Sequence, residues 1–327
     1  MNATAPGTGG LRRQLGSRLF LRVAGPTGPE TRARIHGAPG PRWFAPDRPI
    51  RVVHGDASMF IGGLSALLLQ SLHPRAMAAV AAHSGYRGDP WGRLQRTSTF
   101  LAVTTYGPAE EAQRAVDRVR AVHRSVRGLT PSGEEYWAAD PHLLGWVHAA
   151  EADSFLRAHQ LFGRRPLDAA GCDGYLADTA RVAAALGVED PPRSRAELAA
   201  VLRSYRPELE AGPQAREAAR FLLLHPPLPL AARGPYALLA ANALAVLPPW
   251  ARTLLGLPRV PGLVPGVRLT GHAVTRAIRW ALTPPPYTVA RAGGGAQGGP
   301  DAEAETGAGP APVGKPGAGP GGAPEGR

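Results

Sequence analysis

Cysteine, lysine and long hydrophobic runs are all scarce in this sequence of 327 residues. Cys172 is the only cysteine, so no disulfide can form within the chain, which fits a reducing cytoplasm. The longest apolar stretch, residues 235–250, is shorter than the ~20 residues that a membrane-spanning helix needs, and it ends at Pro248 and Pro249. We therefore predict a buried helix in this stretch and a cytoplasmic protein.

Lysine is nearly absent, since Lys315 is the only lysine among 37 basic residues. Together with the abundance of alanine, glycine and proline, this indicates a compositional bias of the coding sequence. The net charge of +12 is therefore weak support for a nucleic-acid partner. The sequence also has no zinc-finger spacing and no aromatic-rich basic strand. We expect no nucleic-acid partner.

The two ends of the chain differ in composition from its middle. Residues 1–44 are rich in arginine, glycine and proline, and we predict an irregular basic arm. Its apolar residues 19–25 are too short and interrupted for a signal-peptide core. A solvated arm is the favoured interpretation, and peripheral contact with an anionic membrane surface is the alternative. Residues 286–327 are rich in glycine, proline and alanine, which predicts a disordered tail.

The middle of the chain, residues 45–285, is predicted to be one all-α domain of many helices. Apolar residues recur at helical spacing between residues that typically start and stop helices. No segment shows the convincing alternation of apolar and polar residues that is typical of a strand. Gly62 and Gly63 lie in an apolar helix expected at 58–72, where they permit another backbone to approach closely. Further helices are expected from Asp89 to Gly107, Pro108 to Gly128, Asp140 to Gly163 and Asp168 to Gly187, after a Ser194–Glu197 capping box, and near 213–225, 235–247 and 263–281.

His123 is the first candidate functional residue. It follows Val119 by four residues and Val116 by seven, so it lies on the helix stripe that should face the core. A buried imidazole needs a partner. A backbone carbonyl is the common one, and iron or zinc is the alternative. Arg127 comes four residues later and could cover the last helix carbonyls or pair with an anion such as a haem propionate.

Two further groups of polar residues lie near apolar helix faces. Arg93 and Thr97 are spaced four apart on one predicted helix face, where an ordinary surface role is the simpler explanation. His148 lies near another apolar face and is followed by Glu151 and Asp153. The sequence has no H-E-x-x-H motif, and this helix has no Glu-x-x-His motif. A zinc hydrolase or a carboxylate-bridged di-iron protein is therefore disfavoured.

Three segments taken together resemble one oxygenase family. They are residues 67–100, which include LQSLHPRA and GRLQRTSTF, residues 106–128 with AVHRSVRG, and residues 136–156 with GWVHAAEADSF. Their order and spacing are similar to the family that contains the latex-clearing rubber oxygenase and the mpaB-type enzymes, over about residues 45–285. That family is all-α. Its latex-clearing member holds haem b and cleaves an isoprenoid double bond with dioxygen, and the mpaB-type enzyme oxidises a prenyl side chain.

The resemblance implies a role for each candidate residue. His123 matches the proximal haem-iron ligand, and Arg127 matches an arginine one turn later. Arg93 and Thr97 match an arginine–threonine pair near the haem, and His148 matches a histidine position of the family. The chain departs from the family pattern at Glu151, where relatives tend to have threonine or an apolar residue nearby. The lack of a secretion signal argues against extracellular rubber as the substrate.

Three functions follow from these observations as hypotheses. The first is a haem b-dependent oxygenase that uses dioxygen on an apolar, isoprenoid or alkene-bearing small molecule. The second is a family member without oxygenase chemistry that binds a lipid or protein partner, which Glu151 and the basic charge motivate. The third is a non-haem metal enzyme with His123, His148 and either Glu151 or Asp153 as ligands. The sequence makes no prediction of oligomeric state.

Overall fold

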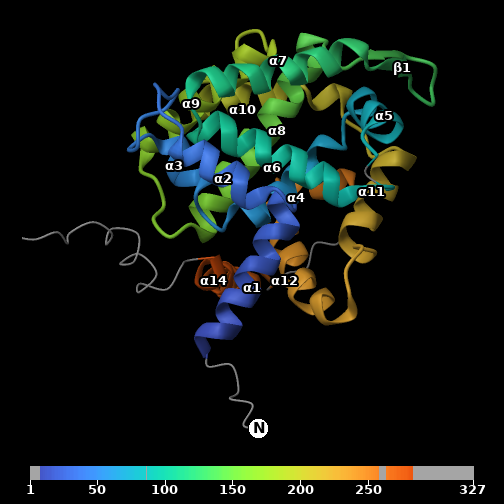
Figure 1. Cartoon of the computed structure of the whole chain (residues 1–327). Coiled ribbons are helices and arrows are strands. Elements are labelled where there is room, and N and C mark those ends of the chain that lie inside the picture. The colour runs from blue at the N-terminus through green and yellow to red at the C-terminus, as the bar shows by residue number, and fades with distance from the viewer. Residues whose placement is uncertain (1–7, 86, 258–262, 283–327) are drawn as a thin grey trace, which may run out of the picture. The chain divides into compact units, whose positions relative to one another are not determined.

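The computed structural model describes residues 8–85, 87–257 and 263–282, and the predicted tail 286–327 lies outside them. Helices dominate these residues, which confirms the all-α prediction (Figure 1). In chain order the elements are α1 Thr8–Ala24, α2 Gly28–Gly37, α3 Pro49–His54, α4 Met59–Gln70, α5 Pro74–His83, α6 Pro90–Tyr106, α7 Ala109–Ser125, β1 Arg127–Leu129, β2 Glu135–Trp137, α8 Pro141–Phe162, α9 Ala169–Leu186, α10 Arg195–Ser204, the 3₁₀ turn η1 Arg206–Glu208, α11 Pro213–Leu224, α12 Leu230–Val246, α13 Pro249–Leu254 and α14 Leu263–Leu282.

Four of the predicted helix starts are confirmed by capping hydrogen bonds. Each capping side chain accepts a hydrogen bond from a backbone N–H in the first turn, which satisfies a group that has no partner within the helix. The bonds run from Gly92 to Asp89, from His142 to Asp140, from Gly171 to Asp168 and from Glu197 to Ser194. At Ser194 the reciprocal bond is shifted by one residue, because the Glu197 carboxylate accepts from the N–H of Arg193.

Residues 8–24 and 28–37 are helical, whereas the sequence predicts an irregular arm there. The arginine-rich α1 packs against α6 and α14. Arg12 Nε donates to the carbonyl of Trp280 at 2.7 Å, and Gly16 lies so close to the carbonyl of Ala281 that a Cβ would clash with it. Tertiary packing of this kind stabilises helices whose local sequence gives little signal, so composition alone was misleading.

The core is built on α4 and α8, which lie against each other. A Cβ added to Gly62 would lie 2.8 Å from Phe155 Cδ1 and 3.1 Å from Phe155 Cα. The predicted close approach of a second backbone at this glycine is therefore confirmed. Around this contact lie large, fully buried side chains such as Trp146 of α8 and Tyr175 of α9.

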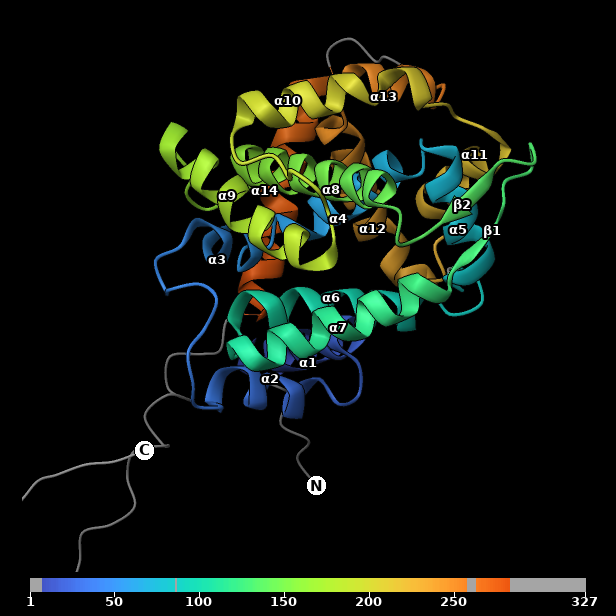
Figure 2. The same ribbon diagram turned by 90° about the horizontal axis from the view of Figure 1, so that it is seen from above.

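In Figure 2, α6 and α7 run side by side, with α1 and α2 on one side of them and α8 with α4 on the other. The helices α3 and α9 join the α6–α7 pair to the centre of the fold. The helix α3 contacts both α6 and α9, and α7 contacts α9 directly. The residues predicted to carry the function lie on α6, α7, the β1–β2 hairpin and α8.

The apolar stretch 235–250 is only partly buried, so the prediction of a buried helix is wrong for its first half. The helix α12 begins earlier, at Leu230, whose side chain is 79% exposed, and Leu238 is also exposed. Burial begins at Ala240, where α12 packs against α4 and α14. Among the described residues, no helix combines the length and the apolarity that crossing a membrane requires.

The helix α7 ends at Ser125, three residues before the predicted end at Gly128. Val126 is extended, and its carbonyl accepts a hydrogen bond from the N–H of Ala138 at 2.9 Å. The following residues pair with β2 as a short antiparallel hairpin that the sequence analysis did not predict, with Arg127 opposite Trp137. Val126 is β-branched and therefore suits an extended conformation. The pairing of Arg127 with Trp137 thus ends the helix before Gly128, the glycine at which the sequence predicted its end.

Candidate functional site

His123 lies in the last turn of α7, and its side chain is partly buried. Its Nδ1 is buried and has no hydrogen-bond partner, and burial lowers the pKa of the imidazole. The stripe of Val116, Val119 and His123 becomes less buried toward the end of the helix, because Val116 is fully buried and Val119 is half-buried. His123 is therefore a neutral imidazole at the edge of the core, and one of its ring nitrogens is unused.

Arg127 does not share a helix face with His123, contrary to the prediction, because α7 ends before it. It lies on β1, and its guanidinium is 4.6 Å from the centre of the Trp137 ring. Its side chain is exposed. A guanidinium over an indole ring is a favourable cation–π pair, so Arg127 also stabilises the hairpin.

Arg93 and Thr97 lie on α6 as predicted, but their surroundings differ. Arg93 is half-buried and donates to Ser84 Oγ at 2.8 Å, next to the end of α5. Thr97 is exposed. Thr104 lies further along the same face and is buried, with its hydroxyl donating to the carbonyl of Phe100. This face of α6 is therefore open near Thr97 and closed near Thr104.

His148 and Glu151 lie one turn apart on α8 and form the most strongly desolvated pair of predicted residues. His148 Nε2 is buried without a hydrogen-bond partner, and burial lowers the pKa of His148 to about 4. Burial also raises the pKa of Glu151 to about 7. Both residues nevertheless keep some accessible surface. They are therefore groups deep in the protein that are not sealed from a small molecule.

Three polar residues that the sequence analysis missed are linked to one another, and one of them, Tyr175, is affected by the charge of Glu151. Burial, and after it the negative charge of Glu151, raises the pKa of Tyr175. The Tyr175 hydroxyl lies 3.4 Å from His54 Nε2, and His54 Nδ1 lies 2.9 Å from Thr105 Oγ1. Burial lowers the pKa of His54 to about 3, so its imidazole is neutral. We call Glu151, Tyr175, His54 and Thr105 the central polar cluster.

The central polar cluster joins α8, α9, α3 and α6. Its members are far apart in the sequence, so no local motif contains them. A weaker signal was present: His54 follows two valines in a short apolar segment, and a polar residue there is expected to need a partner.

Asp153 is the other carboxylate near His148 in the sequence, and it is already engaged. It is buried, and its Oδ2 accepts from Arg157 Nε at 2.7 Å within the same helix. The ion pair offsets part of the cost of its burial, although burial still raises the pKa of Asp153 overall. Of the two carboxylates weighed in the sequence, Glu151 is the one whose charge acts on the pKa of Tyr175.

The residues present fit a haem b group in their donor chemistry. A haem iron takes a neutral imidazole nitrogen, and His123 and His148 are both neutral with a ring nitrogen that lacks a partner. Haem propionates pair with guanidinium groups, and Arg93 of α6 carries such a group, which donates to Ser84 Oγ.

Comparison with known proteins shows which family the chain belongs to. Residues 51–280 match the catalytic domain described as ER-bound oxygenase mpaB/B'/rubber oxygenase. Uncharacterised proteins of Mycobacterium bovis and Mycobacterium tuberculosis are each 38% identical to this chain over 104 residues, which is 31% of this chain and 39% of theirs. The match thus spans about two fifths of the length of these relatives. No solved structure matches the chain significantly.

Proposed function

Because the chain belongs to the family of mpaB and rubber oxygenase catalytic domains, we propose that it is a haem b-dependent oxygenase acting with dioxygen on an apolar, alkene-bearing small molecule. One observation carries this proposal. Within the matched region, His123 and His148 are neutral imidazoles that each have a buried ring nitrogen without a partner. Buried polar atoms are usually satisfied by a protein group, an ordered water or a bound ligand, so these two nitrogens are candidates for a ligand.

His123 would hold the haem iron, as the family resemblance implies. Haem b, when bound, supplies an iron centre that binds and activates dioxygen. Burial keeps the His123 imidazole neutral, which is the form that coordinates iron. Val119 precedes it by one turn on the same side of α7, and its half-buried side chain offers apolar surface to a macrocycle.

Arg93 and Arg127 would neutralise the haem carboxylates, each from a different element. Arg93 acts from α6, where Ser84 already orients its guanidinium. Arg127 acts from the hairpin, where Trp137 holds its guanidinium in place. The exposed Thr97 follows Arg93 by one turn on α6 and can donate a hydrogen bond at the open part of that face.

Glu151 would take and return a proton during the reaction. A pKa of about 7 lets a carboxyl group do both near neutral pH. Tyr175 stays protonated because its pKa is raised, and its hydroxyl lies 3.4 Å from His54 Nε2. Half-buried Leu101 and Val147 pack against the core on α6 and α8 and supply apolar surface for a hydrocarbon substrate.

The test of this proposal is oxygen incorporation by the haem-loaded full-length protein. An acyclic isoprenoid hydrocarbon serves as the probe under ¹⁸O₂, and the product is analysed for labelled carbonyl groups. We expect labelled product from the wild type and at least a ~10-fold slower reaction in His123→Ala, because the loss of a mere support of a metal ligand already costs about 10–100-fold. Val122→Ala is the matched control, since Val122 precedes His123 and is exposed. Absence of label, or an equal rate in His123→Ala, would overturn the proposal.

A further inference from the structure

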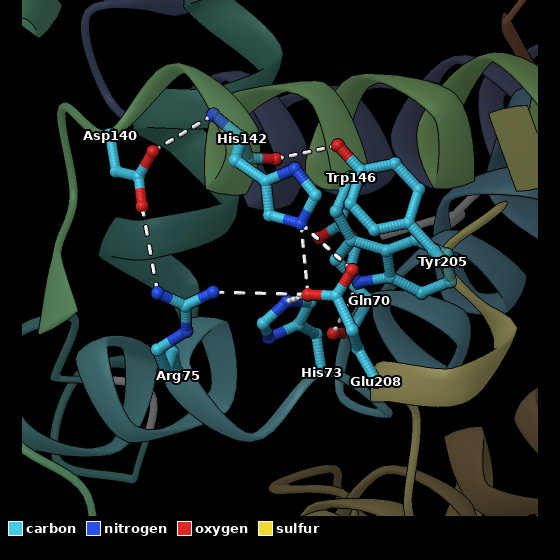
Figure 3. A network of polar contacts seen from close by, with 8 residues as sticks. All are labelled: Gln70, His73, Arg75, Asp140, His142, Trp146, Tyr205 and Glu208. Atoms are coloured by element: carbon cyan, nitrogen blue, oxygen red, sulfur yellow. Dashed lines mark hydrogen bonds and ion pairs between the residues drawn. The ribbon is translucent and has the colours of Figure 1, made fainter. Parts of the chain in front are cut away.

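A second group of metal-binding side chain types lies where α5, α8 and η1 meet, and the proposed function uses none of its members. His73 is the N-cap residue of α5, His142 lies in the first turn of α8, and Glu208 ends η1. His142 Nε2 lies 2.9 Å and 2.8 Å from the two carboxylate oxygens of Glu208. His73 Nε2 lies 3.4 Å from Glu208 Oε2. Figure 3 shows the three side chains converging from their separate elements.

We propose that His73, His142 and Glu208 bind one divalent transition-metal ion, with Zn²⁺ the best fit, and that water or an exogenous ligand completes its coordination. The candidate ligand atoms of the three residues all lie within 4.8 Å of one another. Two imidazole nitrogens and one carboxylate oxygen are a ligand set that Zn²⁺ prefers when a further position stays open. Zn²⁺ also binds such sites more tightly than Mn²⁺ or Fe²⁺.

The state of His73 is the observation that points most directly to a ligand. Its side chain is 2% exposed, and neither ring nitrogen has hydrogen-bond geometry to any partner. Nε2 nevertheless faces Glu208 at 3.4 Å, too far and too poorly aligned for a normal hydrogen bond. A buried polar atom in this state reduces stability unless something satisfies it. A metal ion between the imidazole and the carboxylate would do so.

The three side chains are held in place by contacts of their own backbones and neighbours. The Trp146 indole donates to the carbonyl of Gln70, which anchors the chain just before His73. The N–H of Glu210 donates to the carbonyl of Leu72 at 2.9 Å, so the segment after Glu208 is fixed beside His73. The Tyr205 hydroxyl donates to the carbonyl of His142 at 2.7 Å. Preorganised ligands of this kind reduce the entropy that binding costs.

The surrounding charges also favour a cation. Glu208 and Asp140 bring two negative charges, and Arg75 brings one positive charge. Arg75 lies 3.8 Å from Glu208 Oε2 and 3.7 Å from Asp140 Oδ2, which is ion-pair distance without a direct hydrogen bond. The group is therefore negative overall when both imidazoles are neutral. His142 and Glu208 are partly exposed, so an ion can enter from solvent.

The test is a Zn²⁺ titration of the metal-free, untagged full-length protein in competition with a chromophoric chelator. We expect one ion per chain with micromolar or tighter affinity. His142→Ala and Glu208→Gln should each weaken binding at least ~10-fold, since each removes a ligand. Their side chains are partly exposed, so both variants should fold, and circular dichroism checks this. Replacing Zn²⁺ with Co²⁺ should give visible absorption bands that both variants lose.

Three matched controls make the result specific. Glu210→Gln changes an exposed carboxylate two residues from Glu208, and His225→Ala removes an exposed imidazole elsewhere. Neither should alter Zn²⁺ affinity. His123→Ala should retain it as well, which separates this site from the proposed haem ligand. The proposal would be overturned if the wild type did not bind Zn²⁺ saturably, or if His142→Ala and Glu208→Gln bound Zn²⁺ with the same affinity as the wild type.

Discussion

Burial changes the pKa of Glu151 strongly, as it does that of the other predicted site residue on α8, His148. Glu151 has a carboxyl group that burial keeps largely protonated up to neutral pH, with a pKa of about 7 against an ordinary value of 4.5. Proteins pay for such a group in stability, and the usual reason is a function that needs a proton acceptor near pH 7. The sequence indicated its unusual place in the family pattern but not its pKa.

Replacing Glu151 with Gln should therefore stabilise the protein in a pH-dependent way. The folded state holds the Glu151 proton more tightly than the unfolded state, so the free energy of unfolding falls as pH rises from 4.5 to about 7. Above pH 7 the full penalty is present. We expect Glu151→Gln to gain about 1–3 kcal/mol at pH 8, a range that allows for solvent screening of a partly accessible group, and little at pH 4.5.

Urea unfolding of the wild type and the variant at pH 4.5, 6 and 8 measures this difference. Glu135→Gln is the control, because Glu135 is exposed on β2 and should show almost no change at any pH. A gain that is the same at pH 4.5 and pH 8 would show that Glu151 is not a desolvated acid in the folded protein.

How well single residues could be foreseen depended on where their partners lie. His123 and His148 stood out in the sequence because each interrupts an apolar face of one helix. The roles of His54 and His73 did not, because their neighbours come from distant segments. His54 is 121 residues from Tyr175 in the chain, and His73 meets Glu208 only through the packing of α5 against η1 and α8.

At the scale of elements, helix starts were predictable and one helix end was not. The starts at Asp89, Asp140 and Asp168 are fixed by a side chain and an N–H within the same turn. The end of α7 depends instead on Val126 joining a hairpin with Ala138. A local rule that ends helices at glycine contains no information on that pairing.

The packing of α4 on α8 gives a prediction from two adjacent glycines. Gly62→Ala should destabilise the protein by about 1–3 kcal/mol, because its Cβ would press on the backbone and ring of Phe155 and force a shift in a tight core. Gly63→Ala is the matched control. Its Cβ would lie 3.7 Å from Phe155 Cε1, an ordinary contact, so the better helix propensity of alanine should leave it neutral or stabilise it by up to about 1 kcal/mol.

Chemical denaturation of the two variants beside the wild type gives the answer. If Gly62→Ala proved as stable as Gly63→Ala, the close approach of α4 and α8 at this position would be incorrect.

At the scale of the whole molecule, the sequence predicted the class of fold but not which distant segments meet. Arg279 of α14 forms a bidentate pair with Asp56, 223 residues earlier, at 3.0 Å and 2.8 Å. It also donates to the carbonyl of Phe162 at the end of α8. These contacts dock α14 beside α8 and the start of α4, and α1 in turn packs on α14. No periodicity or motif in the sequence predicts such pairings between distant segments. For this reason the N-terminal segment was predicted to be irregular, although residues 8–24 and 28–37 are helical.

Haem binding would involve distant parts of the molecule, since α6, α7 and the β1–β2 hairpin would each present a residue to one group. The most direct measurement is the absorption spectrum of the full-length protein titrated with haem b. We predict saturation at one haem per chain with a sharp Soret band in the wild type and in Val122→Ala, and loss of that band in His123→Ala with the helical circular dichroism retained. A Soret band of equal position and intensity in His123→Ala would contradict the account.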